Sequence, residues 1–254
     1  MSSPSLLEID WPLPRGVRAA FTTRLGGASA APWDSFNLGT HVGDDPVHVA
    51  ANRARLRALL DLPEEPGWLN QVHGHGVADL DAAPADAPVP TADAAIARAP
   101  GRACVIMVAD CLPVLFATRD GDRIGAAHAG WRGLAAGVLE STVKAMKVPA
   151  SHLSAWLGPA ISQAHFEVGA EVRDVFVATD AGASAYFAAN PRGRFQCDLA
   201  GLARRRLAAL GVGAISGGEW CTFGDPERFY SHRRDAQARG SSGRLAALVW
   251  KTHR

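Results

Sequence analysis

The stretch VIMVADCLPVLFATRDGDRIGAAHAGWRG, residues Val105 to Gly133, holds the clearest strand pattern in the chain. Three apolar runs between residues 104 and 129 have the length and composition of buried strands, and the turn sequence RDGD joins the last two as a hairpin. Cys111 and His128 stand where these runs end. Sulfur and imidazole groups contribute little to packing there, so the stretch predicts a buried sheet with chemically active side chains at its edge.

The flanking sequence predicts further strands and helices that mix without a regular alternation. We expect, in order, a strand at 16–24, a helix at 44–62, a strand with a polar end at 67–81, a helix at 134–148, a strand at 153–161, helices at 169–179 and 199–210, and a last strand at 244–252. No internal repeat is visible. The pattern therefore predicts an α+β (mixed α/β) fold, a single-domain layered sandwich over residues 1–254.

Two of the connections between these elements are predicted to have different roles. Residues 25–45 form a long loop rich in Gly, Asn and Asp turns, and long loops in compact domains are usually functional, so we expect this one to form a wall of a site. Asp45 and Pro46 then supply the N-cap and first-turn signals of the next helix. The Ala/Pro-rich segment 82–96 has low complexity and is predicted to be a surface connection.

The composition argues against several classes of protein. The chain has 254 residues, 48% of them hydrophobic, and 26 Lys and Arg balance 25 Asp and Glu, so no nucleic-acid partner is expected. No apolar run is long enough to span a bilayer and the start is unlike a signal peptide, which predicts no membrane partner and a cytoplasmic protein. The four cysteines are therefore expected to be reduced thiols, with Cys104 packed in the core.

Three segments, NQVHG, ADCLP and HAGWRG, place His73, Cys111 and His128 beside glycine or proline at predicted strand ends. Two imidazoles and one thiolate suit zinc, and three protein ligands with an open fourth position form a catalytic zinc site. The spacing leaves two alternatives open. One is a buried thiol with two hydrogen-bonded histidines, and the other is a Cys111 nucleophile activated by His128, as in a thiol hydrolase or deamidase.

Other polar residues near these segments are candidates for contact with a substrate. Arg132, in HAGWRG, and the free backbone N–H groups of a strand-to-helix turn would suit an oxyanion such as phosphate. In FYSHRRD, Tyr230 and His232 have rings that can stack on a flat base, and Arg233 can meet an anion. Each of these residues has an ordinary structural role as its alternative.

The common nucleotide-binding and zinc motifs are absent: there is no phosphate-binding loop ending in Gly-Lys-Ser/Thr, no Gly-x-Gly-x-x-Gly after a strand, no His-Glu-x-x-His and no zinc deaminase signature. Any metal site must therefore be assembled from distant segments. Proton transfer likewise falls to isolated carboxylates, for which Asp110 and Glu167 are candidates. Either of them can equally cap backbone donors.

An ordered series of motifs resembles a known family. FTTRLGG, FNLGTHVGDD, NQVHG, ADCLPVLF, HAGWRG, GPAISQAHFEVG and FYSHRRD follow one another as in the bacterial YfiH-like proteins, once labelled multicopper polyphenol oxidases or laccases and now treated as purine nucleoside phosphorylases with adenosine deaminase activity. The resemblance runs nearly end to end. It implies a sandwich distantly like a toxin deamidase fold, with zinc, or alternatively copper, held by His73, Cys111 and His128.

The resemblance also implies a chemistry. The expected substrates are phosphate and the purine nucleosides adenosine, guanosine, inosine and methylthioadenosine, acted on by a monomer or homodimer that also removes the adenine amino group by hydrolysis. In this assignment Cys111 and His128 belong to the catalytic centre, Asp110 shuttles a proton, and Arg132 holds phosphate against the ribose. The alternatives are a Cys-His hydrolase that edits peptidoglycan precursors, a non-enzymatic partner of cell-wall synthesis, and a copper-dependent polyphenol oxidase.

The sequence departs from the family pattern in two places. Ala160, Ser162, Ala164 and His165 stand where many members have cysteines, so those cysteines cannot be obligatory ligands here. A spacer longer than usual precedes the Gly-Arg pair and puts a role for Arg244 in doubt. The laccase label also fails on numbers, because multicopper oxidation needs roughly ten histidines plus a cysteine. The chain has 9 histidines and a single His-x-His pair.

Overall fold

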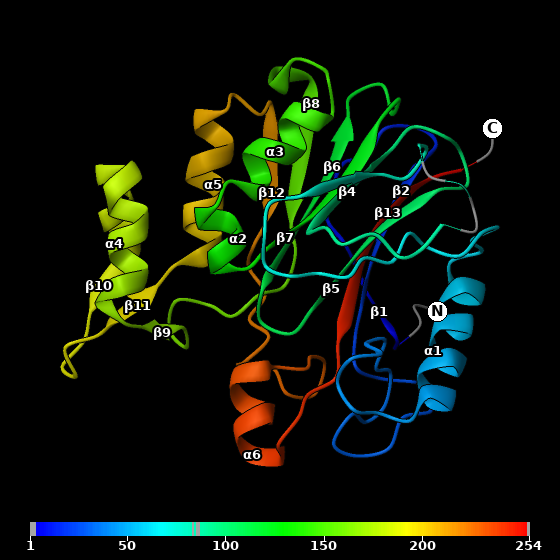
Figure 1. Ribbon diagram of the computed structural model, residues 1–254, viewed down its shortest axis with the longest axis horizontal. Coiled ribbons are helices and arrows are strands. Elements are labelled where there is room, and N and C mark those ends of the chain that lie inside the picture. Colours follow the sequence, from blue (N-terminus) through cyan, green and yellow to red (C-terminus); the bar gives the residue numbers. More distant parts are fainter. Residues whose placement is uncertain (1–3, 83, 85–86, 253–254) are drawn as a thin grey trace.

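Two β-sheets packed face to face form the centre of the computed structural model, which describes residues 4–82, 84 and 87–252 (Figure 1). One sheet has the order β1-β2-β13-β5, with bounds Leu6–Leu7, Val17–Thr22, Leu245–Lys251 and Ala103–Val108. The other has the order β12-β8-β6-β7-β4-β3, with bounds Ala214–Gly217, Leu153–Leu157, Leu112–Thr118, Ile124–Ala129, Ala94–Ala97 and Val77–Asp79. The predicted mixed α/β layered sandwich is confirmed.

Apolar layers on both faces explain why the central strands are unbroken hydrophobic runs in the sequence. Every residue of β5, β6 and β7 is buried, because one face of each strand meets the opposite sheet and the other face meets helices. Between the sheets, Leu115 and Ile124 pack with Phe21 and Val249. The three predicted strands and the β6–β7 hairpin are therefore confirmed.

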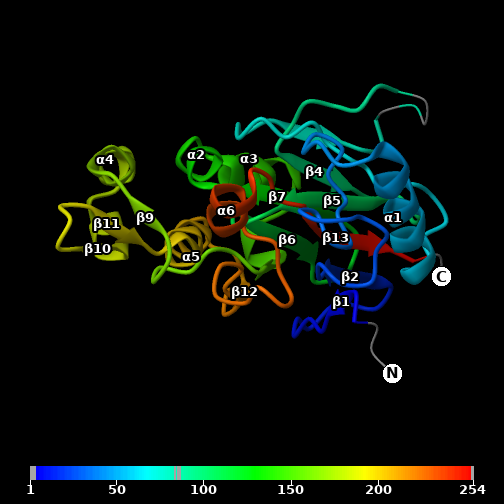
Figure 2. The ribbon, with the colours of Figure 1, turned by 90° about the horizontal axis from the view of Figure 1, so that it is seen from below.

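Helix α1, Pro46–Leu59, covers the outer face of the four-stranded sheet (Figures 1 and 2). Its Leu56 is fully buried against that sheet. The helix begins as predicted, because the Asp45 side chain accepts the Val47 N–H at 2.8 Å. The residues that precede it, 25–45, form the expected long loop.

Three helices cover the outer face of the six-stranded sheet: α2, Trp131–Ala135, α3, Val138–Ala145, and α5, Leu199–Ala209. The single helix predicted at 134–148 is therefore wrong. Gly137 has a left-handed φ of +91°, which glycine adopts without a steric penalty, and it separates α2 from α3. Short α6, Gln237–Arg239, lies near the C-terminal strand. None of the helices within the described residues is both long and apolar enough to cross a bilayer.

A small unit projects from the helical side of the molecule in both views (Figures 1 and 2). It consists of α4, Ala170–Thr179, and a three-stranded sheet of order β10-β11-β9, with bounds Phe187–Ala189, Phe195–Cys197 and Glu167–Val168. The Glu167 carboxylate pairs here with Arg192 and Arg194. These contacts are ion pairs with side chains rather than a cap on backbone donors, and the role of Glu167 in proton transfer stays a prediction.

Two stretches differ from the sequence prediction. Within 67–81, only Val77–Asp79 is a strand, and the residues before it run as a loop with isolated bridges. The segment 82–96 is more than a surface connection, because it ends in the buried strand β4, although its residues 83, 85 and 86 lie outside the described part. Alanine-rich strands carry little periodic hydrophobic signal, which explains why β4 was not predicted.

Candidate metal centre and active site

The β6–β7 hairpin and one loop bring three metal-ligand side chains together. Pro113 pairs with His128 across the hairpin, which places Cys111 beside that histidine. His73, on the loop before β3, lies over the same edge: its Nε2 is 3.9 Å from the Cys111 Sγ, and its ring centroid is 4.8 Å from that of His128. One ligand atom from each residue lies within 4.8 Å of the others. We call these three residues the metal-ligand trio.

Asp93, directly before β4, fixes two members of the trio at once. Its Oδ1 accepts from the His128 Nδ1 and from the His73 backbone N–H, each at 2.8 Å. Its Oδ2 accepts from the backbone N–H groups of Val72 and Gly74 at 3.1 and 2.7 Å. His73 has a left-handed φ of +61°, and these bonds hold the strained turn in place. Asp93 is fully buried, so solvent screens its negative charge only weakly and the attraction to the neighbouring imidazole is strong.

The sequence did not single out Asp93, because it lies at the end of an Ala/Pro-rich stretch. The sequence nevertheless holds a weak signal for a buried, paired carboxylate at this position. The sequence TADAAI places one carboxylate directly before a short apolar run, and a carboxylate at that position must be paired or hydrogen-bonded if the run is buried. What the sequence cannot supply is its partner, because His128 lies on a different strand of the same sheet.

The donor set of the trio fits a divalent metal ion. In a tetrahedral zinc site, ligand bonds of roughly 2.3 Å to sulfur and 2.1 Å to nitrogen place those two atoms about 3.6 Å apart. The distance of 3.9 Å between the Cys111 Sγ and the His73 Nε2 is close to that value. Asp93 engages the Nδ1 of His128 and leaves its Nε2 for the cluster. A carboxylate behind a ligating imidazole is a common feature of metal sites.

Cys111 and His128 also polarise one another. Burial raises the pKa of the Cys111 thiol, but the two imidazoles, His128 first, outweigh burial and lower the pKa to about 6. Burial lowers the pKa of His128, but Cys111 and then Asp93 outweigh it and raise the pKa to about 9. The two opposite shifts favour a thiolate beside an imidazolium in the metal-free protein, and metal binding would displace the imidazole proton.

Two cavities open on either side of Cys111. The larger has a volume of about 590 Å³, and its lining includes Thr40, His41, Arg53, Trp68, Gln71 and Arg244. The smaller has a volume of about 360 Å³, and its lining includes Asp110, Trp131, Arg132, Phe166 and Arg233. His73, Cys111 and His232 belong to both linings, whereas His128 lines only the larger cavity, so the trio lies at the border of the two cavities. The loop 25–45 forms a wall of the larger cavity, as predicted.

Two guanidinium groups make the larger cavity suitable for an anion. Arg53 donates from Nε and Nη2 to the Leu38 carbonyl at 3.0 and 2.9 Å and lies 3.7 Å above the Trp68 ring. Arg244 donates from Nη1 to the Ser242 carbonyl at 2.8 Å. Burial lowers the pKa of both groups. Neither forms a carboxylate ion pair within the described residues, so an incoming anion would meet two partly desolvated cations.

These two arginines were not expected at the site from the sequence. Arg53 was not predicted as a site residue, because it lies in α1, where arginine is an ordinary surface residue. Arg244, whose role the long spacer puts in doubt, nevertheless lies at this cavity: its backbone N–H donates to the Asn37 side chain at 2.9 Å and its side chain belongs to the lining. His41 lies nearby, and its pKa is lowered by burial and then by the two guanidinium groups.

Arg132 lies on the smaller cavity, at the start of α2. Its side chain is exposed, and its guanidinium carbon lies 4.5 Å from the Trp131 ring centroid. Helix α2 has 5 residues, and its N-cap, Gly130, provides no side-chain hydrogen bond. The helix dipole there is correspondingly small, so any anion at this position would depend mainly on the Arg132 charge.

Arg233 and His232 also line the smaller cavity. The Arg233 guanidinium carbon lies 5.6 Å from the Phe166 ring centroid, so a cation and an aromatic ring stand together in its wall. The pKa of His232 is lowered, by burial first and then by Arg244, which favours a neutral imidazole at neutral pH. A neutral imidazole can both donate and accept a hydrogen bond.

Asp110 lies next to Cys111, and its carboxylate is fully engaged by other residues. Its Oδ1 accepts from the Thr222 hydroxyl at 2.7 Å, and its Oδ2 accepts from the Ser231 hydroxyl and the Arg233 N–H at 2.9 and 2.7 Å. Its backbone has a left-handed φ of +84°. These contacts favour a positioning role that joins three chain segments, and the proton shuttle stays a prediction.

Tyr230, a candidate for substrate contact, lines neither of the two cavities. The side chain is fully buried in the core between the sheets, and its hydroxyl donates to the Trp33 carbonyl at 2.6 Å. Burial raises the pKa of this phenol. Phe229, the residue before it in FYSHRRD, is also fully buried. Aromatic residues between charges in the sequence were here the edge of the core.

The structure holds one candidate metal site within its described residues, the trio itself. A multicopper oxidase requires several copper sites, each with its own imidazole and sulfur ligands. The structure thus agrees with the histidine count that a full multicopper centre is missing from the described residues, because the trio can hold a single ion.

The comparisons with known proteins agree over nearly the whole chain. Residues 18–252 match the family described as multi-copper polyphenol oxidoreductase laccase. A Pseudomonas aeruginosa protein named purine nucleoside phosphorylase is 55% identical, over 96% of this chain and 97% of its own. Purine nucleoside phosphorylase YfiH of Escherichia coli is 49% identical, over 96% of this chain and 98% of its own.

Solved structures match the fold equally well. The Neisseria meningitidis protein NMB0706 superposes with a TM-score of 0.92 at 44% identity and covers 98% of this chain and 100% of its own. YlmD from Geobacillus stearothermophilus superposes with a TM-score of 0.90 at 30% identity, over 100% of this chain and 98% of its own. The protein therefore belongs to the YfiH family, the family described as multi-copper polyphenol oxidoreductase laccase.

Proposed function

We propose that the protein is a purine nucleoside phosphorylase, a transferase that moves the ribosyl group of a nucleoside from the purine to phosphate. Relatives that bear this name cover nearly the whole chain. The observation that supports the proposal most strongly is the position of the trio at the border of two cavities of different character. One contains two guanidinium groups without carboxylate partners among the described residues, and the other has aromatic walls.

In this proposal Arg53 and Arg244 bind phosphate in the larger cavity. Both guanidinium groups are held by backbone carbonyls, so they are oriented before the anion arrives. Phosphate then attacks the ribose C1′, a C1′–O bond forms, and the C1′–N9 bond to the purine breaks. The positive charge that develops on the ribose is stabilised by the phosphate itself. The sequence-based placement of phosphate on Arg132 is the alternative that the experiments below distinguish.

The nucleoside would lie in the smaller cavity. Trp131 and Phe166 offer flat apolar surfaces to a purine, with Arg132 and Arg233 beside them. His232, which belongs to both cavities, can donate a proton or hydrogen bond to the purine nitrogen as it leaves. Asp110 holds the backbone of Arg233 in place. The products are a free purine and ribose 1-phosphate.

The trio fits a zinc ion by donor type, with copper as the alternative. When bound, the ion would act as a Lewis acid toward a substrate oxygen or water. Asp93 keeps the His128 ring and the His73 backbone in one orientation, and His73 and Cys111 line both cavities. We further propose that adenosine, guanosine, inosine and methylthioadenosine are substrates. For deamination, water would attack C6 of the adenine base of adenosine, a C6–O bond would form and the amino group would leave as ammonia, which gives inosine.

The direct test is product chromatography with the purified protein and adenosine, with and without phosphate. We expect adenine and ribose 1-phosphate when phosphate is present, and inosine with ammonia when it is omitted. Inosine then serves as a second substrate, because its phosphorolysis gives hypoxanthine without any deamination step. Failure to release a base from any of the four nucleosides, in protein that contains metal, would contradict the proposal.

One observation favours a second candidate function. Asp93, His128 and Cys111 form a carboxylate–imidazole–thiol series, the arrangement of a thiol hydrolase. The presence of His73 at the same sulfur favours the metal site, because a thiol nucleophile needs one imidazole base. Chelation separates the two functions: a thiol hydrolase keeps its activity after the metal is removed, whereas the proposed phosphorylase loses it.

A further inference from the structure

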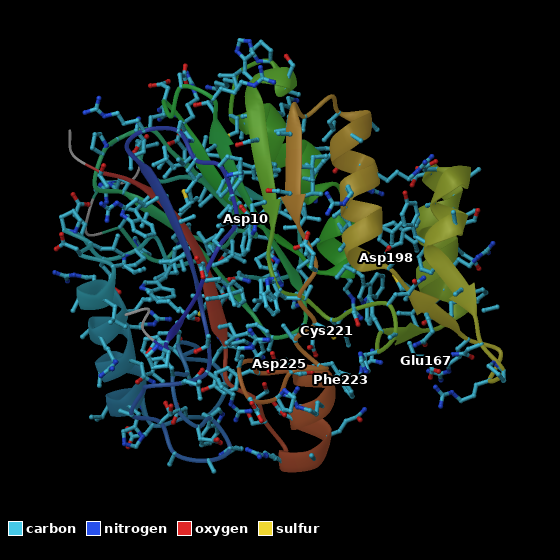
Figure 3. The ribbon with its side chains drawn as sticks, turned by 180° about the vertical axis from the view of Figure 1, so that it is seen from behind. Asp10, Glu167, Asp198, Cys221, Phe223 and Asp225 are labelled. Atoms are coloured by element: carbon cyan, nitrogen blue, oxygen red, sulfur yellow. The ribbon has the colours of Figure 1, made fainter. Side chains whose placement is uncertain are left out.

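A second cysteine–histidine cluster lies outside both cavities. The Cys221 Sγ is 3.5 Å from the His165 Nδ1, and the Ser162 hydroxyl lies 3.3 Å from the same nitrogen. Phe223 stacks on the His165 ring, with centroids 4.6 Å apart and an interplanar angle of 22°. Figure 3 shows Cys221 and Phe223 close together. None of these four side chains lines the two cavities around the trio.

The surroundings of the Cys221 sulfur favour nucleophilic chemistry. Backbone N–H groups of Ser162 and Gly224 are directed at Sγ from 3.4 and 3.3 Å, and such donors bond an anionic sulfur more strongly than a neutral one. His165 stands where it can accept the thiol proton. Cys221 is half-buried and His165 is exposed, so small reagents can reach the pair.

The buried cysteines provide a contrast within the same chain. Cys104 and Cys197 are both fully buried, and burial raises the pKa of each thiol. Neither has a histidine among its hydrogen-bond partners in the described part of the chain. A buried protonated thiol is a poor nucleophile, so these two residues serve as internal references for an unreactive cysteine.

We propose that Cys221 is a modification site, a reactive thiol that forms mixed disulfides with low-molecular-weight disulfides. The Cys221 Sγ attacks one sulfur of the disulfide, a new S–S bond forms to Cys221, and the original S–S bond breaks. The thiol proton passes to His165 and then to the departing thiolate. The small disulfide is the oxidant, and one of its halves leaves as a free thiol.

The position of Cys221 connects this modification to the smaller cavity. Thr222, the next residue, donates its hydroxyl to the Asp110 carboxylate at 2.7 Å. Ile161, which lines that cavity, donates its N–H to the Asp110 carbonyl at 2.9 Å. A substituent on Sγ competes for space with the Ser162 and Gly224 N–H groups that now contact it. An adduct therefore displaces the two segments that hold Asp110, the residue beside Cys111.

Peptide mapping after exposure to oxidised glutathione tests the thiol. We expect the adduct on Cys221 to form at least about 10-fold faster than on Cys104 or Cys197, and His165→Gln to slow it about 5-fold. His152→Gln, which changes an exposed histidine elsewhere, is the matched control and should react like the wild type. Equal rates at all three cysteines, or an unchanged rate in His165→Gln, would overturn the proposal.

Hydrogen exchange of the same samples tests the connection to the cavity. The adduct should speed amide exchange in residues 160–162 by at least about 3-fold, because the Ile161 and Ser162 N–H groups lose their partners. Cys221→Ser treated with oxidised glutathione should show no such change. Unaltered exchange in the modified wild type would refute the connection. Neither measurement involves a nucleoside or phosphate, so both outcomes are independent of the proposed phosphorylase activity.

Discussion

The two cysteine–histidine clusters of this molecule differ in what stands behind the histidine. Behind His128 lies a fully buried carboxylate, Asp93, and a second imidazole reaches the same sulfur. Behind His165 lies the flat face of Phe223, and backbone N–H groups hold the sulfur of Cys221. A buried carboxylate fixes the imidazole tautomer and supplies negative charge, which suits a cation. Among the described contacts of His165 no carboxylate occurs, and this favours thiol chemistry in the second cluster.

The largest expected effect comes from exchanging one sulfur for oxygen in each cluster. Cys111→Ser should lower kcat/KM for phosphorolysis at least about 1,000-fold, roughly 4 kcal/mol of transition-state stabilisation, because a ligand of the proposed metal is lost. Cys221→Ser should stay within about 2-fold of the wild type. Steady-state kinetics with inosine and phosphate measure both. Similar losses in the two variants would remove the distinction between the clusters.

The carboxylate behind His128 gives the next largest effect. Asp93→Asn should weaken metal binding about 10- to 100-fold, because it removes the charge that orients and polarises the ligating imidazole. Competition with a chromophoric chelator measures the affinity. His165→Gln, in the cluster without a carboxylate, is the control and should leave metal affinity unchanged. An Asp93→Asn protein with wild-type affinity would show that the buried carboxylate is there only for packing.

The charges around the first cluster allow a smaller effect to be predicted. Arg244→Met should raise the KM for phosphate about 10- to 30-fold, roughly 2 kcal/mol, because a charge-assisted hydrogen bond to the anion is lost. Arg132→Met should change the KM for phosphate less than about 3-fold and should act mainly on the KM for the nucleoside. Initial rates over a range of phosphate concentrations separate the two. The opposite order would return phosphate to Arg132 and the smaller cavity.

The smallest effect concerns Tyr230, which lies in the core rather than in either cluster. Tyr230→Phe should lower the free energy of unfolding by about 1 kcal/mol through loss of the bond to the Trp33 carbonyl, with the kinetic constants unchanged. Urea denaturation followed by tryptophan fluorescence gives the stability. A clear change in the KM for a nucleoside, at full stability, would contradict the assignment of this residue to the core.

The sequence predicted those parts of the fold whose signals are local. The runs that became β5, β6 and β7 are buried on both faces, so they appear as continuous apolar segments. Asp45 and Pro46 marked the start of α1 correctly. The break at Gly137 was missed, because a glycine within a helical pattern has the same local appearance whether or not it ends the helix.

The candidate site contains contacts that local sequence patterns cannot predict. His73, Cys111 and His128 were selected by their chemistry, but what holds them depends on Asp93, whose hydrogen-bond partners lie on other segments. Arg53 and Arg244 are ordinary residues in the sequence and become an anion site only because the sheet brings α1 and the start of β13 to one cavity. Tyr230 shows the opposite case: the sequence left open whether its ring contacts a substrate or belongs to the edge of the core, and the side chain is fully buried.

The metal content of the purified protein tests the central claim most directly. Elemental analysis of the wild type, Cys111→Ala and Cys221→Ser, isolated without added metal, compares the two clusters in a single experiment. We expect about one zinc or copper ion per chain in the wild type and in Cys221→Ser, and almost none in Cys111→Ala. Full metal content in Cys111→Ala, or a metal-free wild type that still releases purine from inosine, would contradict it.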